Sequence, residues 1–208
     1  MNKFVKFLLS TVAITCFAFS SLAAHCGCEN EFCECTEDGC CGCSTVFELA
    51  LFAPIQTAKV SDSICGVRLN LIYGYNCSVT GLDIGIVNRL SNDMTGYQFG
   101  LFNLVGNDLV GTQIGLINQV CGSGFGYQYG IINMVQGHFS GLQDGFLNTA
   151  CSVCGMQAGI INYTESMSGF QFGLVNYTDT LCGIQLGLIN IQTCRPCLSV
   201  LPILNVSW

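Results

Sequence analysis

Apolar and polar residues alternate in eight-residue stretches that recur along most of the chain. In "GFQFGLVN" at 169–176, Phe170, Phe172 and Leu174 lie two residues apart, with glycine or glutamine between them. A period of two is that of a β-strand, and two glycines within five residues would cost a helix on the order of 2 kcal/mol. The pattern therefore predicts strands, and we expect their apolar faces to stack inward and supply the core.

The same unit occurs nine times at nearly constant spacing. Successive units begin five times at steps of 15 residues and then three times at steps of 14, with linkers of seven and then six turn-forming residues between them. The first glycines of the units are Gly66, Gly81, Gly96, Gly111, Gly126, Gly141, Gly155, Gly169 and Gly183. Glycine at these positions permits tight corners and positive φ.

Two all-β architectures accept units of this size. A repeat β-solenoid would make each unit one coil, giving about nine 14–15-residue coils and a rod of roughly 40 Å at ~4.8 Å per coil. An outer-membrane up-and-down β-barrel is the alternative, and the terminal "VLPILNVSW", ending on Trp208, resembles the C-terminal assembly signal of such barrels. Barrel units should differ between odd and even strands, whereas these do not, so the constant linkers favour the solenoid.

Stacked coils would bring identical amide side chains together. We expect one asparagine ladder and one glutamine ladder, whose amides bond to the next coil. The asparagines are Asn88, Asn103, Asn118, Asn133, Asn148, Asn162, Asn176 and Asn190. The glutamines are Gln98, Gln113, Gln128, Gln143, Gln157, Gln171 and Gln185. Asp144 stands where other units carry an apolar residue, so we expect it to interrupt the inner stripe.

Four stretches together resemble a known family. They are "FAPIQT" at 52–57, "GVRLNLIYG" at 66–74, the repeats themselves and "LPILNVSW" at the end. In this order they resemble the bacterial, leptospiral-type surface-repeat protein family with tandem G-x-Q-x-G-L-x-N units. The resemblance implies an exported envelope or surface protein without an established molecular activity, and it supplies no catalytic residue.

The pattern divides the chain into five segments. Residues 1–24, with two lysines, a short apolar run and small residues at the end, predict a cleaved secretory signal peptide rather than a retained anchor. A Cys-rich acidic head at 25–44, a lead-in at 45–65, the repeat array at 66–196 and a C-terminal capping strand at 197–208 follow. Beyond the signal only Lys59, Arg68, Arg89 and Arg195 are basic, against thirteen acids, which argues against nucleic acid as a partner.

Fifteen cysteines follow the signal, seven of them in the head. In an exported protein we expect disulfides, within the head or to other chains, and the local pairs Cys151 with Cys154 and Cys194 with Cys197. An odd number leaves at least one thiol for another chain or a ligand. The C-x-C spacing of the head also suits zinc or copper(I), so metal sequestration remains an alternative. Its ligands would be Cys26, Cys28, Cys33, Cys35, Cys40, Cys41 and Cys43.

No arrangement of residues indicates catalysis. His25 and His138 are the only histidines, and neither has a nucleophile and a carboxylate at a recognisable spacing. We therefore expect a non-enzymatic protein without cofactors, structural or interacting in role. It would lie at the outer membrane or cell surface, or in the periplasm, and be linked through its head to other envelope proteins or to itself. A small outer-membrane barrel or pore is the alternative.

Overall fold

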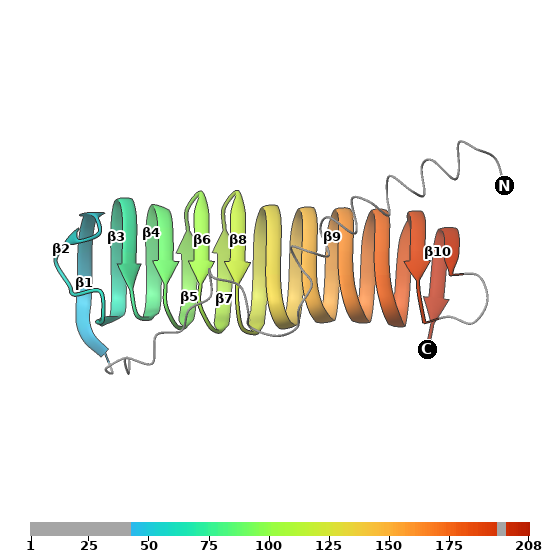
Figure 1. The fold of residues 1–208 in the computed structure, drawn as a ribbon, viewed down its shortest axis with the longest axis horizontal. Coiled ribbons are helices and arrows are strands. Elements are labelled where there is room, and N and C mark those ends of the chain that lie inside the picture. Colours follow the sequence, from blue (N-terminus) through green and yellow to red (C-terminus); the bar gives the residue numbers. More distant parts are fainter. Residues whose placement is uncertain (1–42, 195–198) are drawn as a thin grey trace.

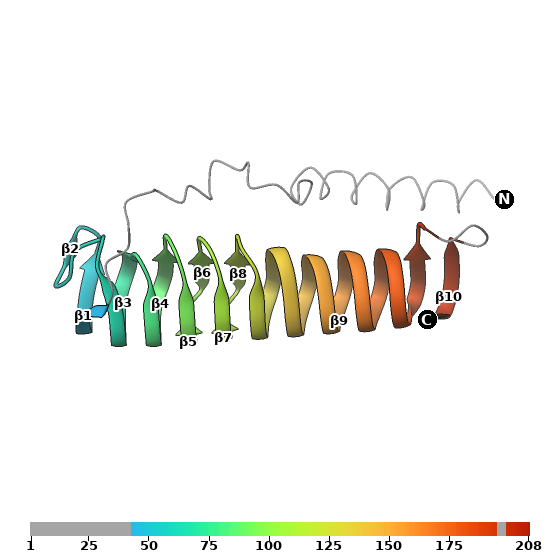
Figure 2. The same cartoon turned by 90° about the horizontal axis from the view of Figure 1, so that it is seen from below.

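The computed structural model describes residues 43–194 and 199–208, which form a straight rod of stacked β-coils (Figures 1 and 2). The strands are β1 (Cys43–Phe52), β2 (Ile55–Gln56), β3 (Ser63–Asn76), β4 (Val79–Leu90), β5 (Met94–Phe99), β6 (Phe102–Val105), β7 (Leu109–Ile114), β8 (Ile117–Val120), β9 (Gly124–Gln192) and β10 (Val200–Ser207). The described part of the chain contains no helix of the length and apolarity needed to span a membrane. The signal peptide and nearly all of the head lie outside the described residues.

Neighbouring coils pair in parallel and in register, one repeat apart. Gly81 of β4 pairs with Gly96 of β5, Gly96 with Gly111 of β7, and Gly111 with Gly126 of β9. An up-and-down barrel requires antiparallel neighbours. The parallel register therefore confirms the β-solenoid and excludes the barrel.

Each coil consists of two short strands joined by two turns. In the coil of β7 and β8, the chain turns at 115–116, inside the repeat, and again at 121–123, in the linker. β5 and β7 stack on one side of the rod, and β6 and β8 stack on the other. From Gly124 onward the same path is continuous strand, β9, which winds through the remaining coils (Figure 1).

The side chains point opposite to the expected directions. Gln171 and Asn176 are buried, whereas Phe170, Phe172 and Leu174 are each more than half exposed. The expectation that the apolar face forms the core is therefore wrong, because the amide face is the one turned inward. Asp144, in consequence, lies on the outer surface and interrupts no inner stripe.

The apolar core comes mainly from the linkers instead. Most of its members lie two residues before a repeat glycine or two residues after a repeat asparagine, although Thr164, Thr178 and Gln192 take the second of these places in the last three repeats. The buried cluster contains Ala58, Ile64, Val79, Leu90, Met94, Val105, Leu109, Val120, Val135, Phe139, Ala150, Val153, Met167 and Leu181. The linkers are expected to be turns, yet most of their residues continue the strands, and those that point inward form the core.

Both ends of the rod are covered by strands of a different kind. At the N-terminal end β1 pairs in parallel with β3, and the short β2 folds back antiparallel on β1. At the C-terminal end β10 pairs antiparallel with the last coil, from Val200 opposite Ile191 to Ser207 opposite Gly183. The strand edges of the first and last repeat coils are therefore covered by β1 and β10.

Candidate functional site

Two glycines in every repeat after the first allow the coils to approach one another closely. Numbering the repeat G1-x2-Q3-x4-G5-x6-x7-N8, the nine glycines at position 1 have φ between 123° and 156°, a region that side chains with a Cβ rarely adopt. At position 5 the reason is space. A Cβ on Gly173 would strike the carbonyl oxygen of Gly159 and would lie 2.7 Å from the amide nitrogen of Asn162.

The position-8 asparagines form one continuous buried ladder. Each side-chain amide donates to the amide oxygen of the next asparagine over 2.8–2.9 Å, from Asn88 to Asn190. Its second N–H donates to a backbone carbonyl of the next coil, as from Asn118 to Tyr129 at 2.9 Å. These carbonyls fix the orientation of the amides from Asn88 to Asn176, so their donors point toward the C-terminal end.

The position-3 glutamines form a second ladder of opposite polarity. Each glutamine donates to the amide oxygen of the preceding coil over 2.7–2.9 Å, from Gln185 back to Gln98. Gln98 in turn donates to Asp83 at 2.8 Å, and a carboxylate can only accept. Asp83 therefore sets the direction of the whole glutamine ladder, and Asn205 of β10 closes it by donating to Gln185 at 2.7 Å.

At the N-terminal end, charged side chains take the glutamine positions. Glu48 pairs in register with Arg68, and Arg68 with Asp83, and all three residues are fully buried. Arg68 donates from two nitrogens to the two carboxylate oxygens of Asp83, at 2.8 and 2.7 Å. The guanidinium is thus already neutralised by Asp83, which leaves Glu48 as the excess charge.

Glu48 is the least satisfied group of this cluster. Neither of its carboxyl oxygens has a hydrogen-bond partner of ordinary geometry among the described residues, and Asn70 Oδ1 is likewise unpaired there. Burial raises the pKa of Glu48 to about 7, with the nearby Arg68 guanidinium acting in the opposite direction. The sequence did not single out this cluster; the signal was present in Arg68 and Asp83, which stand where later repeats have glutamine.

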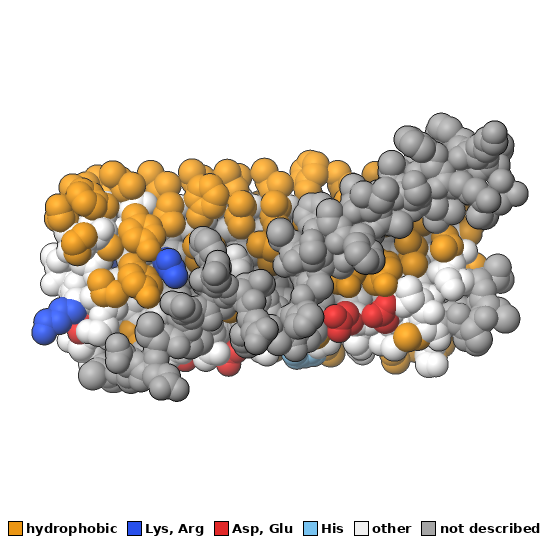
Figure 3. Space-filling view, in the orientation of Figure 1, with side chains coloured by type: hydrophobic (Ala, Val, Ile, Leu, Met, Phe, Trp, Pro, Cys, Tyr) orange, Lys and Arg blue, Asp and Glu red, His pale blue; other side chains and the backbone are white. Residues whose placement is uncertain are grey.

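The outward side chains at positions 4, 6 and 7 form an apolar edge along the rod. Every position-6 side chain is exposed, from Leu71 through Phe146 to Leu188. The position-6 side chains are Leu71, Ile86, Leu101, Leu116, Ile131, Phe146, Ile160, Leu174 and Leu188. Figure 3 shows the apolar side chains gathered along the upper margin of the rod. Asp144 is the only charged residue at these three positions.

The opposite edge, formed by the linker turns, is polar and acidic. Asp93 accepts hydrogen bonds from Asn107 at 2.8 Å and from the backbone of Asp108 at 3.1 Å. His138 and Ser152 also meet there, Nδ1 to Oγ at 2.7 Å, a contact that the sequence did not indicate. No carboxylate bonds to this ring within the described residues, and the pair is exposed, so it lacks the third group and the enclosed site of a hydrolase.

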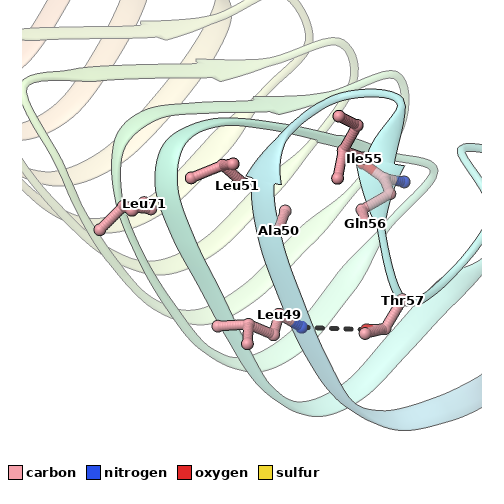
Figure 4. Close-up of a pocket in the computed structure, with 7 residues that line it drawn as sticks. All are labelled: Leu49, Ala50, Leu51, Ile55, Gln56, Thr57 and Leu71. Carbon is pink, nitrogen blue, oxygen red and sulfur yellow. Dashed lines mark hydrogen bonds between the residues drawn. The ribbon is translucent and has the colours of Figure 1, made fainter.

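An apolar pocket lies at the N-terminal end of the rod. It has a volume of about 400 Å³ and is lined by side chains of β1, β2, Thr57 and Leu71 (Figure 4). Leu49 donates its backbone N–H to the Thr57 hydroxyl at 3.0 Å, which holds the segment after β2 against β1. Because Leu71 is also the first position-6 residue, the pocket is continuous with the apolar edge.

The cysteines do not pair as the sequence suggested. Cys154 and Cys194 are free and exposed, so the expected local pairs with Cys151 and Cys197 do not form, although Cys151 is itself in a disulfide. Cys43 forms a disulfide with Cys65 in the next coil, which removes it from the alternative metal set. The other six head cysteines of that set lie outside the described residues. Within 43–194 and 199–208 no three His, Cys, Asp or Glu side chains are grouped to hold a metal ion.

No family model, no curated protein and no solved structure matches the chain.

Proposed function

We propose that the protein is a non-enzymatic structural or interaction protein of a bacterial cell envelope, exported by its N-terminal segment, in which the solenoid is a rigid rod and the apolar edge is its contact surface. The observation that carries this proposal is the continuous exposure of apolar side chains at position 6. The resemblance to surface-repeat proteins supports the envelope as the location.

The apolar edge is not needed to complete the core. The rod's interior already contains the linker-derived cluster and two ladders whose amides are bonded from coil to coil. On the outside, the edge measures about 43 Å by about 15 Å, an area on the order of 600 Å². Monomeric soluble proteins rarely expose a larger contiguous apolar patch without a function for it. A binding role explains why position 6 is apolar in every repeat.

The test is fractionation of cells that express the full chain with its own leader. We expect the wild type in the envelope fraction and expect Phe172→Ser/Leu174→Ser/Leu188→Ser, three exposed residues of the edge, to move to the soluble fraction. The matched control, Ser152→Asn/Glu165→Gln/Thr180→Ser, alters the polar edge of neighbouring coils and should fractionate as the wild type. If both variants stay with the envelope, the edge is not the contact surface.

A second candidate role, covalent linkage between chains, is favoured by the free thiols. Cys154, Cys182 and Cys194 are exposed on the outside of the rod. We expect envelopes prepared without reductant to contain disulfide-linked oligomers that disappear on reduction. Cys154→Ser/Cys182→Ser/Cys194→Ser should abolish them if these thiols form the links. Oligomers that persist in this variant would assign the links to the head, and their absence from the wild type would remove the role.

A further inference from the structure

We propose that the apolar edge seats the rod on the surface of a lipid bilayer, with the position-6 side chains entering the acyl region and the acidic linker edge facing water. This inference rests on the proposed function and specifies the partner of its contact surface. Four features of the described residues support a bilayer over a second protein chain.

The first feature is the shape of the edge. The chain turns at 100–101 and 115–116, so position 6 is the crest of a ridge, with position 4 on one flank and position 7 on the other. Two such ridges would touch along their crests and leave the flanks exposed. A fluid acyl phase, by contrast, can surround the crest and both flanks.

The second feature is the area. Even full coverage of the edge, about 600 Å², is below the ~800 Å² that each partner of a standard protein interface buries. A dimer through this surface alone would therefore be weak. Insertion of the crest by about 7 Å, the length of two strand residues, falls within the ~5–10 Å typical of interfacial amphipathic segments.

The third feature is the placement of tyrosine on the two flanks. Tyr97 and Tyr127 lie at position 2 on one side of the rod, and Tyr163 and Tyr177 follow the repeat asparagine on the other. Tyr163 and Tyr177 stack with their ring centroids 4.8 Å apart, and the Tyr177 hydroxyl donates to Asp179 at 3.0 Å, toward the acidic edge. Tyrosine with an apolar ring and a hydrated hydroxyl is enriched at the level of lipid headgroups.

The fourth feature is the separation of charge, from which Asp144 alone departs among the residues at positions 4, 6 and 7. Asp93, Asp108, Glu165 and Asp179 all lie in linkers, on the margin opposite the crest. The acidic side chains visible in Figure 3 lie in the lower half of the rod, away from the apolar upper margin. An acidic rod gains nothing from anionic headgroups, so binding should depend on apolar insertion and should not weaken at high salt.

The experiment is flotation of the purified full chain with unilamellar phosphatidylcholine vesicles. We expect the wild type to float with the vesicles at low and high salt, and expect Leu116→Ser/Phe146→Ser to reduce the floated fraction at least fivefold. The matched control is Val110→Ser/Phe125→Ser, which removes two equally exposed apolar side chains that lie away from the edge. This control should float as the wild type, and circular dichroism with thermal unfolding checks that all variants fold.

A spectroscopic arm locates the edge relative to the bilayer. In a Trp208→Phe background, a single tryptophan from Ile131→Trp should shift its emission to the blue with vesicles and be quenched by brominated lipid. A single tryptophan introduced by Phe125→Trp in the same background should show neither the blue shift nor the quenching.

Three outcomes overturn the inference in distinguishable ways. In the first outcome, the wild type does not float but forms a dimer in solution, and Leu116→Ser/Phe146→Ser converts the dimer to a monomer. The edge then binds a second copy of the chain, and the proposed function stands. Flotation lost equally in the edge and control variants shows unspecific adsorption. If the edge variant changes neither flotation nor oligomeric state nor cell fractionation, the edge is not a contact surface, and the proposed function is wrong as well.

Discussion

At the scale of single residues, the rod depends on buried amides and on repeat glycines, because other residues at these positions would break ladder hydrogen bonds or clash with the next coil. A buried amide normally carries a burial penalty unless all of its groups are bonded. Here each asparagine finds its partner in the same asparagine one coil away, 2.8–2.9 Å distant. This spacing requires backbones at strand distance, and glycine at positions 1 and 5 leaves room for it.

Replacing a position-5 glycine should be severe. Gly173→Ala would place a methyl group against the Gly159 carbonyl and the amides of Asn162 and Asn176. The coils would have to separate locally, breaking ladder bonds, and we expect a loss of about 3 kcal/mol or more in the free energy of unfolding. Urea denaturation measures it. Ser168→Ala, at an exposed position, should change it by less than about 0.5 kcal/mol, and equal losses in the two variants would contradict the account.

The direction of the glutamine ladder makes a pH-dependent prediction. In Gln128→Glu, an ionised carboxylate still accepts from Gln143 but opposes the acceptor oxygen of Gln113. Only the protonated acid can donate there, so the fold should raise the pKa of this carboxyl and lose stability as pH rises. We expect about 3 kcal/mol less stability than the wild type at pH 7 and most of it regained near pH 4.

The control for this experiment is Gln119→Glu, at a partly buried position outside the ladder. It should show little difference between the two pH values. Similar pH profiles for the two variants would mean that the ladder has no fixed polarity at Gln128.

At the scale of elements, the two ends of the rod differ in kind. At the C-terminal end, Asn205 of β10 ends the glutamine ladder with a neutral amide, which donates to Gln185 and also to Gln192 at 3.3 Å. At the N-terminal end, β1, β3 and β4 contribute the buried Glu48, Arg68 and Asp83, respectively. The neutral cap is satisfied, whereas the charged cap retains an unpaired carboxyl.

Glu48 should therefore make the rod less stable as the solution becomes alkaline. The unfolded chain releases the Glu48 proton near pH 4.5, whereas the folded chain holds it until about pH 7. Between these values the folded state binds more protons, so the free energy of unfolding falls with rising pH, by ~3 kcal/mol in total from this group. Glu48→Gln should remove this fall and raise stability at pH 8.

Chemical denaturation at pH 5 and pH 8 tests the prediction. Asp144→Asn removes a carboxylate from the outer face and should leave the pH dependence unchanged. If Glu48→Gln destabilises the rod at pH 8, the carboxylate stabilises Arg68 rather than being in excess.

At the scale of the whole molecule, the rod is a one-dimensional array in which each coil contacts its neighbours. The change of step from 15 to 14 residues after Gly141 leaves both ladders unbroken, with Gln157 donating to Gln143 at 2.8 Å. Linker length is thus adjustable, while the register of positions 1 to 8 is not.

Removing one complete repeat should consequently leave a folded protein. Deletion of residues 155–168 joins Cys154 to Gly169 and would place Gln171 beneath Gln143, and Asn176 beneath Asn148. We expect native circular dichroism and, by small-angle scattering, a rod shorter by about 4.8 Å. Deletion of residues 155–161 instead puts Asn162 at the repeat-glycine position and should abolish cooperative unfolding. Two deletions of equal effect would argue against the array.

The sequence was sufficient for the period, the strands and the two ladders, because identical residues at constant spacing can meet only by stacking. The alternation at Phe170, Gln171 and Phe172 shows which residues share a face, but nothing in it states which face turns inward. Hydrophobicity suggested the phenylalanines, and this was wrong. The signal for the core is the pair of apolar residues in most linkers, such as Ala150 and Val153, which lie among turn-forming residues.

What the amino-acid sequence determined by itself is therefore the β-solenoid, its coil length and the chemistry of its ladders. The tertiary structure alone decided that the amides lie inside and the aliphatic and aromatic side chains outside. The physical reason is that an amide in one isolated strand would be buried unsatisfied, whereas the same amide in a stack bonds to its copy above and below. Only the assembled rod removes that penalty, and by doing so it leaves an apolar edge free for contact.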